Sequence, residues 1–179
     1  MRTLVTGAVR SGKTRVAEGL LTTGVTYIAT GPVPDAADPE WQARVAGHQA
    51  SRPAGWTTVE TTDPATALAA LTGPALLDCL GTWLTATLDD QDAWTAPRAA
   101  WSGPLHDRIQ AVVHAWTDCP HDLVAVTNEV GWGLVSEYPA GRIFADELGR
   151  LNQVLAAASD RVLLVVAGRV LELPAPEDR

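Results

Sequence analysis

The strongest chemical signal in the sequence is the run Gly7-Ala8-Val9-Arg10-Ser11-Gly12-Lys13-Thr14, which fits the pattern G-x-x-x-x-G-K-[ST]. An apolar segment (residues 3–6) precedes this run, and a helical pattern (residues 15–21) follows it. A strand, a glycine-rich turn and a helix in this order form the context in which the pattern binds the phosphates of a nucleoside triphosphate. Gly7 and Gly12 allow successive backbone N–H groups to turn toward one anion, and the start of the helix adds further donors. We call residues 7–14 the phosphate loop.

Two side chains of the phosphate loop have separate expected roles. Lys13 would reach the β- and γ-phosphates, and the hydroxyl group of Thr14 would bind Mg²⁺. Lys13 is the only lysine in the chain, beside twelve arginines. A lysine carries a compact charge on a flexible stem, whereas the guanidinium group of arginine is a planar fork. The single lysine at this position therefore favours a genuine phosphate site over a glycine-rich turn that fits the pattern by chance.

Two carboxylates follow other apolar segments. Asp78 comes near the end of residues 74–80, as in the Walker B pattern that holds Mg²⁺ directly or through water, and a helix-capping aspartate is the alternative. Glu129 could serve a metal ion or a substrate hydroxyl group, and a structural hydrogen bond to the adjoining loop is the alternative. Asn128 does not begin the Asn-Lys-x-Asp guanine signature, so the sequence does not indicate a regulatory GTPase.

His48 is the histidine with a candidate chemical role. A histidine near the end of a helix is most often solvated or capping. The functional alternative is a nucleophile or an acid–base group beside the phosphate site, with Arg52 as its charge partner. His106, His114 and His121 lie in a more polar part of the sequence, and we expect them at the surface.

Strands that alternate with helices must position these groups. Strands are predicted at residues 3–6, 25–29, 57–60, 74–80, 122–127 and 161–167, and helices at residues 15–21, from 38 to before 52, at 63–71, from 82 to a break at 89–92, from there through about 116, and at 140–158. This alternation predicts an α/β fold of the P-loop NTPase type: a mostly parallel sheet with helices on both faces and the ligand at the carboxyl ends of the strands. Residues 170–173 are predicted to add one antiparallel edge strand.

Length and composition are typical of one globular domain. The chain has 179 residues, of which 46% are hydrophobic and 19% charged. We expect a single nucleotide-binding domain over residues 1–173 and a mobile tail over residues 174–179. The formal net charge of −8 argues against nucleic acid or an anionic membrane as the main partner, because both favour a basic surface.

The sequence also indicates where the protein works. The longest purely apolar run, residues 162–167, is far shorter than the roughly 20 residues of a membrane span. The sequence enters its first strand directly, without a secretory segment, so we expect a cytoplasmic protein. Cys79 and Cys119 are isolated and lack metal-ligand spacing, which favours two buried free thiols.

Five segments in one order carry a more specific resemblance. They are the phosphate loop, Tyr-Ile-Ala-Thr at residues 27–30, His48 followed by Arg52-Pro53 and Trp56, Thr-Asn-Glu-Val-Gly-Trp-Gly at residues 127–133, and Leu-Asn-Gln-Val-Leu-Ala-Ala-Ala-Ser-Asp at residues 151–160 with Leu-Val-Val-Ala-Gly at 164–168. Together they resemble the bifunctional adenosylcobinamide kinase / adenosylcobinamide-phosphate guanylyltransferase family of cobalamin biosynthesis. The resemblance covers nearly the whole chain.

The resemblance implies two reactions and their substrates. ATP or GTP would phosphorylate the aminopropanol hydroxyl group of adenosylcobinamide, a corrinoid, and GMP from GTP would then pass to that phosphate through a guanylylated histidine. Many relatives carry two adjacent histidines before the Arg-Pro pair, whereas this chain has Gly47-His48-Gln49, so only His48 can supply the imidazole. The resemblance further implies a small homo-oligomer, with a homotrimer expected.

The expected site therefore draws on several segments. Catalytic roles fall to His48 and Lys13, Mg²⁺ to Thr14 and Asp78, and a role in acid–base chemistry or substrate binding to Glu129 and Asn128. The residues expected to contact nucleotide are Gly7, Ala8, Val9, Arg10, Ser11, Gly12, Lys13, Thr14, Thr30, Gly31, Pro32, Gln49, Ala50, Ser51, Arg52, Glu60 and Asp78.

Other parts of the assignment stay open at this stage. Trp41, Trp83 and Trp132 are candidates for contact with the large flat corrinoid, with ordinary core or interface packing as the alternative. One alternative function is a P-loop kinase for another small alcohol, in which His48 is structural. A second is a nucleotide-binding switch or assembly module without metabolic chemistry.

Overall fold

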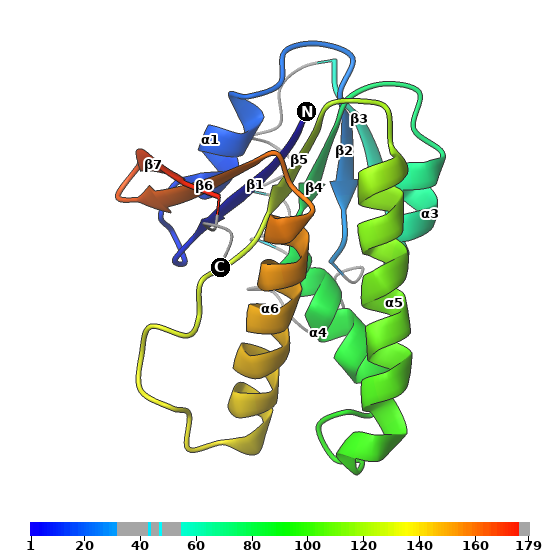
Figure 1. Ribbon diagram of the computed structural model, residues 1–179, viewed down its shortest axis with the longest axis vertical. Helices are drawn as coiled ribbons and strands as arrows, with labels where there is room; N and C mark the ends of the chain where they lie inside the picture. The colour runs from blue at the N-terminus through cyan, green and yellow to red at the C-terminus, as the bar shows by residue number, and fades with distance from the viewer. Residues whose placement is uncertain (32–42, 44–46, 48–54, 176–179) are drawn as a thin grey trace.

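The structure is a computed structural model, and it describes residues 1–31, 43, 47 and 55–175. Its strands are β1 (Arg2–Gly7), β2 (Thr26–Ala29), β3 (Thr57–Glu60), β4 (Ala75–Asp78), β5 (Leu123–Val126), β6 (Arg161–Val166) and β7 (Arg169–Leu173). Its helices are α1 (Lys13–Glu18), α3 (Pro64–Ala69), α4 (Leu80–Asp90), α5 (Arg98–Asp118) and α6 (Pro139–Ala157). Figure 1 shows the sheet with α4, α5 and α6 grouped on one side and α1 on the other.

The described strands form one sheet in the order β3-β2-β4-β5-β1-β6-β7. All neighbouring strands are parallel except β6 and β7, which pair as an antiparallel hairpin. Ala167 and Gly168, both with positive φ (50° and 76°), form its two-residue turn, as the twist of a tight hairpin favours. The predicted parallel sheet and its antiparallel edge strand are therefore confirmed.

Apolar side chains cover both faces of the sheet. On one face Val5, Tyr27 and Val126 pack with Ala17 of α1. The larger cluster on the other face joins the sheet to α3, α4, α5 and α6, and its fully buried tryptophans are Trp83, Trp101 and Trp116. Strands buried on both sides read as continuous apolar runs, which is why the sequence pattern found them.

Helix α3 begins as the sequence predicts. Asp63 is its N-cap: one carboxylate oxygen accepts from the Thr66 backbone N–H at 3.1 Å, and the other accepts from the Thr66 hydroxyl group at 2.7 Å. These hydrogen bonds hold the pKa of Asp63 below its usual value. Pro64 occupies the first helical position, where a missing N–H costs nothing.

The strand predicted at residues 74–80 ends earlier than expected. Strand β4 stops at Asp78, and α4 begins at Leu80 with Cys79 as its N-cap. The Thr82 hydroxyl group accepts from the Cys79 backbone N–H at 3.4 Å. This hydrogen bond caps the first turn of α4, so the helix begins directly after the strand. Periodicity could not find this boundary, because Cys79 and Leu80 are as apolar as the strand before them.

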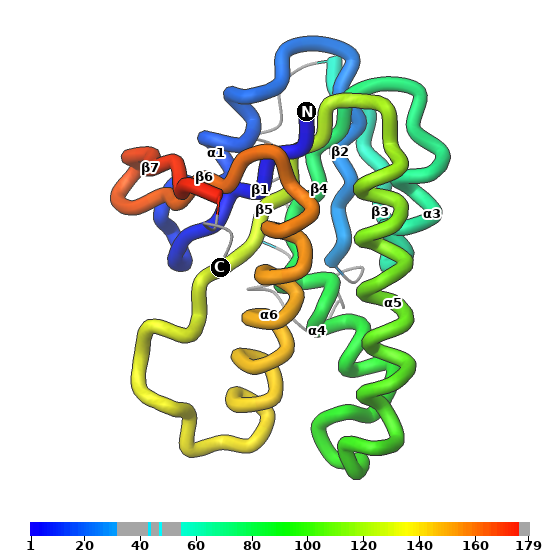
Figure 2. The backbone as a smooth tube through the Cα atoms, in the orientation of Figure 1, coloured from blue at the N-terminus to red at the C-terminus, as the bar shows by residue number. Residues whose placement is uncertain are grey.

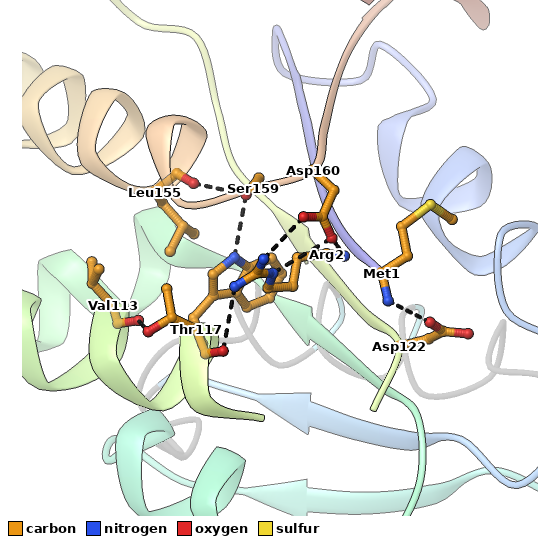
Figure 3. Close-up of polar contacts among 9 residues, drawn as sticks. Met1, Arg2, Val113, Thr117, Asp122, Leu155, Ser159 and Asp160 are labelled. Atoms are coloured by element: carbon orange, nitrogen blue, oxygen red, sulfur yellow. Dashed lines mark hydrogen bonds and ion pairs between the residues drawn. The ribbon is translucent and has the colours of Figure 1, made fainter. Parts of the chain in front are cut away.

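A polar cluster fixes the edge of the sheet where the strands begin. Figure 3 shows Arg2, the first residue of β1, between Asp160 and Thr117. Its guanidinium group donates to Asp160 Oδ1 at 2.9 Å and to the Thr117 carbonyl at 3.3 Å, and this ion pair holds the pKa of Asp160 below its usual value. Trp116 Nε1 donates to Ser159 Oγ nearby, at 3.2 Å. These contacts join β1, α5 and the start of β6 at the edge opposite the phosphate loop.

None of the helices in the described part of the chain is long and apolar enough to cross a membrane.

Candidate active site

The phosphate loop connects β1 to α1. Gly7 ends β1, and a Cβ atom there would lie 2.4 Å from the Val165 carbonyl oxygen and 2.7 Å from Ser11 Oγ. Gly12, the N-cap of α1, has φ of 91°, a left-handed conformation that other residues rarely adopt. A larger residue at Gly7 would clash with its neighbours, and at Gly12 it would have to adopt a strained backbone conformation.

Lys13 is the first residue of α1, and its side chain folds back over the phosphate loop. Its Nζ atom donates a hydrogen bond to the Ala8 carbonyl oxygen at 3.3 Å. The positive charge therefore lies over the turn that the motif provides for phosphate. Thr14 follows in the first turn of α1 and is partly exposed, as a hydroxyl ligand for a metal must be.

The β6–β7 hairpin supports the phosphate loop from the side. The Gly168 backbone N–H donates to the Ser11 carbonyl oxygen at 2.8 Å, and a Cβ atom on Gly12 would lie 3.4 Å from Gly168 Cα. Figure 2 shows the red and orange hairpin beside the blue phosphate loop. Residues more than 150 positions apart meet here, a contact that no local pattern in the sequence could reveal.

Asp78 lies at the end of β4, and β5 separates that strand from β1. The Tyr27 hydroxyl group donates to Asp78 Oδ2 at 2.5 Å and orients the carboxylate. Asp78 does not cap α4, because Cys79 occupies the N-cap position, so the capping alternative is wrong. Burial raises the pKa of the Cys79 thiol, which keeps it protonated and unsuited to act as a nucleophile.

Glu129 lies directly beside the start of the phosphate loop. Its Oε1 atom accepts from the Thr6 hydroxyl group at 2.7 Å, and its backbone N–H donates to the Gly7 carbonyl oxygen at 3.2 Å. This side-chain hydrogen bond joins Glu129 to β1. The structural alternative supposed a hydrogen bond to the adjoining loop instead. Asn128 lies against the first turn of α4, where a Cβ atom on Gly81 would be 3.3 Å from its Nδ2 atom.

The remaining described candidates lie farther along the same edge. Thr30 is fully buried, and its hydroxyl group donates to the Cys79 carbonyl oxygen at 2.7 Å, so that group is engaged within the protein. Gly31 follows Thr30 after β2, and Glu60 ends the edge strand β3. Three inter-strand spacings separate β2 from β1, about 14 Å at roughly 4.8 Å each. The candidates therefore spread along the whole carboxyl edge.

Several candidates lie outside the described residues: Pro32, His48, Gln49, Ala50, Ser51, Arg52 and Trp41. Of the other two tryptophans, Trp83 is only 1% exposed and belongs to the core, so the corrinoid alternative is wrong for it. Trp132 is 71% exposed, in the loop that follows Glu129. Nothing in the sequence shows that the hydroxyl groups of Thr6 and Tyr27 orient the two carboxylates, because these contacts between distant segments form only when the sheet assembles.

Comparisons with known proteins identify relatives of this chain. Residues 3–173 match the family described as cobinamide kinase / cobinamide phosphate guanyltransferase. The chain is 42% identical over 180 residues to the bifunctional adenosylcobalamin biosynthesis protein CobU of Salmonella typhimurium, covering 94% of this chain and 97% of that protein. It is 36% identical to the bifunctional adenosylcobalamin biosynthesis protein CobP of Pseudomonas aeruginosa, covering 98% and 96%.

A solved structure, the P4 protein from bacteriophage phi6 in complex with ADP, is similar with a TM-score of 0.44 and 18% identity, over 94% of this chain and 52% of that chain. The family assignment does not depend on it. The family match excludes the alternatives of a kinase with a single activity and of a switch without metabolic chemistry. The chain belongs to the bifunctional cobinamide kinase / cobinamide phosphate guanyltransferase family of adenosylcobalamin biosynthesis.

Proposed function

We propose that the phosphate loop, Asp78 and Glu129 form the kinase site, where ATP or GTP phosphorylates the aminopropanol hydroxyl group of adenosylcobinamide. The observation that carries this proposal is the position of Lys13 Nζ, folded over the loop 3.3 Å from the Ala8 carbonyl oxygen, together with a carboxylate, that of Glu129, which accepts a hydrogen bond from Thr6 at the end of β1. The purified protein should convert adenosylcobinamide and γ-labelled nucleotide into a labelled corrinoid phosphate. Release of labelled inorganic phosphate alone would refute the proposal.

The residues of the kinase site have separate roles in this reaction. The loop N–H groups and Lys13 hold the β- and γ-phosphates and stabilise the charge that develops on them. The substrate hydroxyl oxygen attacks the γ-phosphorus, the bond to the β-phosphate oxygen breaks, and a nucleoside diphosphate leaves. Glu129, acting as general base, accepts the hydroxyl proton.

We propose that Thr14 and Asp78 hold Mg²⁺. Both offer oxygen ligands, and Asp78 is kept in place by the Tyr27 hydroxyl group. The described residues contain no group of three or more His, Cys, Asp or Glu that could hold a metal. This fits Mg²⁺, which usually takes one or two protein ligands together with phosphates and waters. When bound, the ion would neutralise charge on the β- and γ-phosphates.

The Asp78→Asn variant tests the metal assignment. The amide keeps the shape of the side chain but loses its charge, so the Mg²⁺ concentration for half-maximal kinase rate should rise at least about fivefold. Titrating Mg²⁺ at saturating nucleotide measures this shift. An unchanged Mg²⁺ requirement together with a lower Tm would show that Asp78 is structural.

We propose that His48 carries GMP in the second reaction. Its imidazole nitrogen attacks the α-phosphorus of GTP, and pyrophosphate leaves. A phosphate oxygen of adenosylcobinamide phosphate then attacks the same phosphorus, the P–N bond breaks, and adenosylcobinamide-GDP forms. The sequence supports nucleotide contacts from Thr30 to Pro32, from Gln49 to Arg52 and from Glu60. Of these, Gly31 and Glu60 lie at the edge of the sheet that also carries the phosphate loop.

We propose that the loop after Glu129 contacts the corrinoid. Its exposed apolar side chains include Trp132 (71%), Leu134 (101%) and Tyr138 (76%), a concentration that is unusual on a free surface. The loop starts beside Gly7, where the substrate hydroxyl group must reach the γ-phosphate.

The Trp132→Ala variant should raise the KM for adenosylcobinamide about tenfold, since an aromatic contact contributes roughly 1.5 kcal/mol at most beyond its area. The KM for nucleotide should stay within about twofold. Trp132→Phe keeps a ring and should retain most of the affinity. Steady-state kinetics with each substrate varied in turn measures both constants, and an unchanged corrinoid KM in Trp132→Ala would refute the assignment.

We propose that residues 1–173 form a single domain with a tail over residues 174–179, and that the protein assembles as a homotrimer. The family resemblance supports the trimer, and sedimentation equilibrium measures it directly.

A further inference from the structure

We infer that Asn152, on α6, is a positioning residue for the kinase reaction, because it holds residues 127–129 so that the Glu129 carboxylate stays at the phosphate loop. The inference rests on the role proposed above for Glu129. The two side-chain hydrogen bonds that carry it join Asn152 to Thr127 and Asn128.

Asn152 uses both ends of its side-chain amide. Its Oδ1 atom accepts a hydrogen bond from the Thr127 hydroxyl group at 2.6 Å, and its Nδ2 atom donates to the Asn128 carbonyl oxygen at 3.0 Å. Thr127 is fully buried, and Asn152 is half-buried. Because one end must donate and the other accept, these two bonds define the orientation of the amide.

The opposite side of the same segment is bonded to β1 and the phosphate loop. The Thr127 N–H donates to the Val5 carbonyl at 2.9 Å, and the Glu129 N–H donates to the Gly7 carbonyl at 3.2 Å. The Thr6 hydroxyl group donates to Glu129 Oε1. Residues 127–129 therefore lie between α6 and the end of β1.

The segment lies beyond the last paired residues of β5, and two backbone hydrogen bonds, from the Thr127 and Glu129 N–H groups, join it to the end of β1. The β1–β5 pairing ends with Val5 opposite Val126, and the chain beyond Glu129 runs into the exposed loop that contains Trp132. Figure 1 shows this yellow loop leaving the sheet and arching away from α6. The two hydrogen bonds of Asn152 join residues 127 and 128 to α6, so they limit how far a displacement of the loop reaches Glu129.

The contacts are specific to an asparagine. An aspartate at this position would still accept from Thr127, but it could not donate and would place a carboxylate against the Asn128 carbonyl. Gln153, the next residue, is exposed and offers a matched control on the same helix. Asn152→Asp and Gln153→Glu each replace an amide by a carboxylate, so they make the same change in charge.

The test compares kinase rates of four variants. Glu129→Gln should lower kcat about 100-fold, the lower end of the range for losing a general base. Asn152→Asp should lower kcat about tenfold while the KM for nucleotide stays within about twofold. Gln153→Glu should match the wild type. The double variant Asn152→Asp/Glu129→Gln should be no slower than Glu129→Gln alone, because without the carboxylate there is nothing left to position.

Different results overturn different claims. A wild-type kcat in Asn152→Asp, or a double variant slowed by the product of both single effects, would show that Asn152 does not act through Glu129. A wild-type kcat in Glu129→Gln would instead refute the proposed role of Glu129, whatever Asn152→Asp does. If Asn152→Asp does not fold, Thr127→Val removes one of the two bonds while keeping the side-chain shape. It should show the same tenfold, non-additive loss, and additive loss there would overturn the inference.

Discussion

The Lys13→Ala variant is expected to lose at least about 100-fold in kinase turnover while keeping its fold. Lys13 is the charged donor folded over the phosphate loop, and losing one preorganised donor of this kind usually costs about 100-fold to 1,000-fold in kcat. Its Nζ atom donates to the Ala8 carbonyl oxygen of the same loop, so removing the side chain should leave the core intact. Single-turnover phosphorylation of adenosylcobinamide measures the loss, and thermal unfolding checks the fold.

The Lys13→Arg variant is the matched control for charge. Arginine keeps the positive charge, but its planar fork does not fit a loop shaped around a compact ammonium group. We therefore expect its turnover to fall close to that of Lys13→Ala. Near-normal turnover in Lys13→Arg would contradict the assignment of this loop as the phosphate site.

The His48→Asn variant is expected to abolish guanylyl transfer and to leave the kinase reaction largely unchanged. Without an imidazole no histidine–GMP intermediate can form, whereas the proposed phosphoryl transfer uses the phosphate loop, Lys13 and Mg²⁺ and does not involve His48. Two assays on one preparation separate the reactions: phosphorylation of adenosylcobinamide, and GMP transfer to supplied adenosylcobinamide phosphate. Loss of both activities together would show that His48 supports the fold or a shared nucleotide site.

The dependence on pH follows from the same chemistry. The attacking nitrogen must be unprotonated, so GMP transfer should fall as the pH drops through the ordinary histidine range near about 6.5. The isolated adduct should break down in acid and persist in alkali, because protonation of the nitrogen makes it a good leaving group. An adduct with the opposite behaviour would indicate a nucleophile other than histidine.

The sequence predicted the local structures that depend on one continuous segment. The phosphate loop, with Gly7 and Gly12 at its turns, and the Asp63 cap of α3 each follow from residues a few positions apart. The parallel order of the strands followed from the alternation of buried strands and helices. Local sequence pattern and tertiary packing favour the same structure in these segments, so their structure can be predicted from the sequence.

The contacts between distant segments could not be predicted. Nothing in a motif shows that Thr6 donates to Glu129, or that Gly168 donates to Ser11, since each pair is joined only when the sheet forms. Asp78 resembled a helix cap because it precedes α4 by two positions, and the structure gives the cap to Cys79. Trp83 looked like a ligand-binding aromatic, but helical packing buries it in the core.

The intact mass of the protein after incubation with GTP tests the central claim most directly. The claim is that one chain performs both reactions and that His48 carries GMP as the intermediate of the second. We predict that the wild-type protein gains the mass of one GMP and that the His48→Asn variant gains no mass. Any GMP that the Lys13→Arg variant takes up should also be attached to His48. A wild-type protein that stays unmodified while producing adenosylcobinamide-GDP, or a His48→Asn protein that still takes up GMP, would contradict the account.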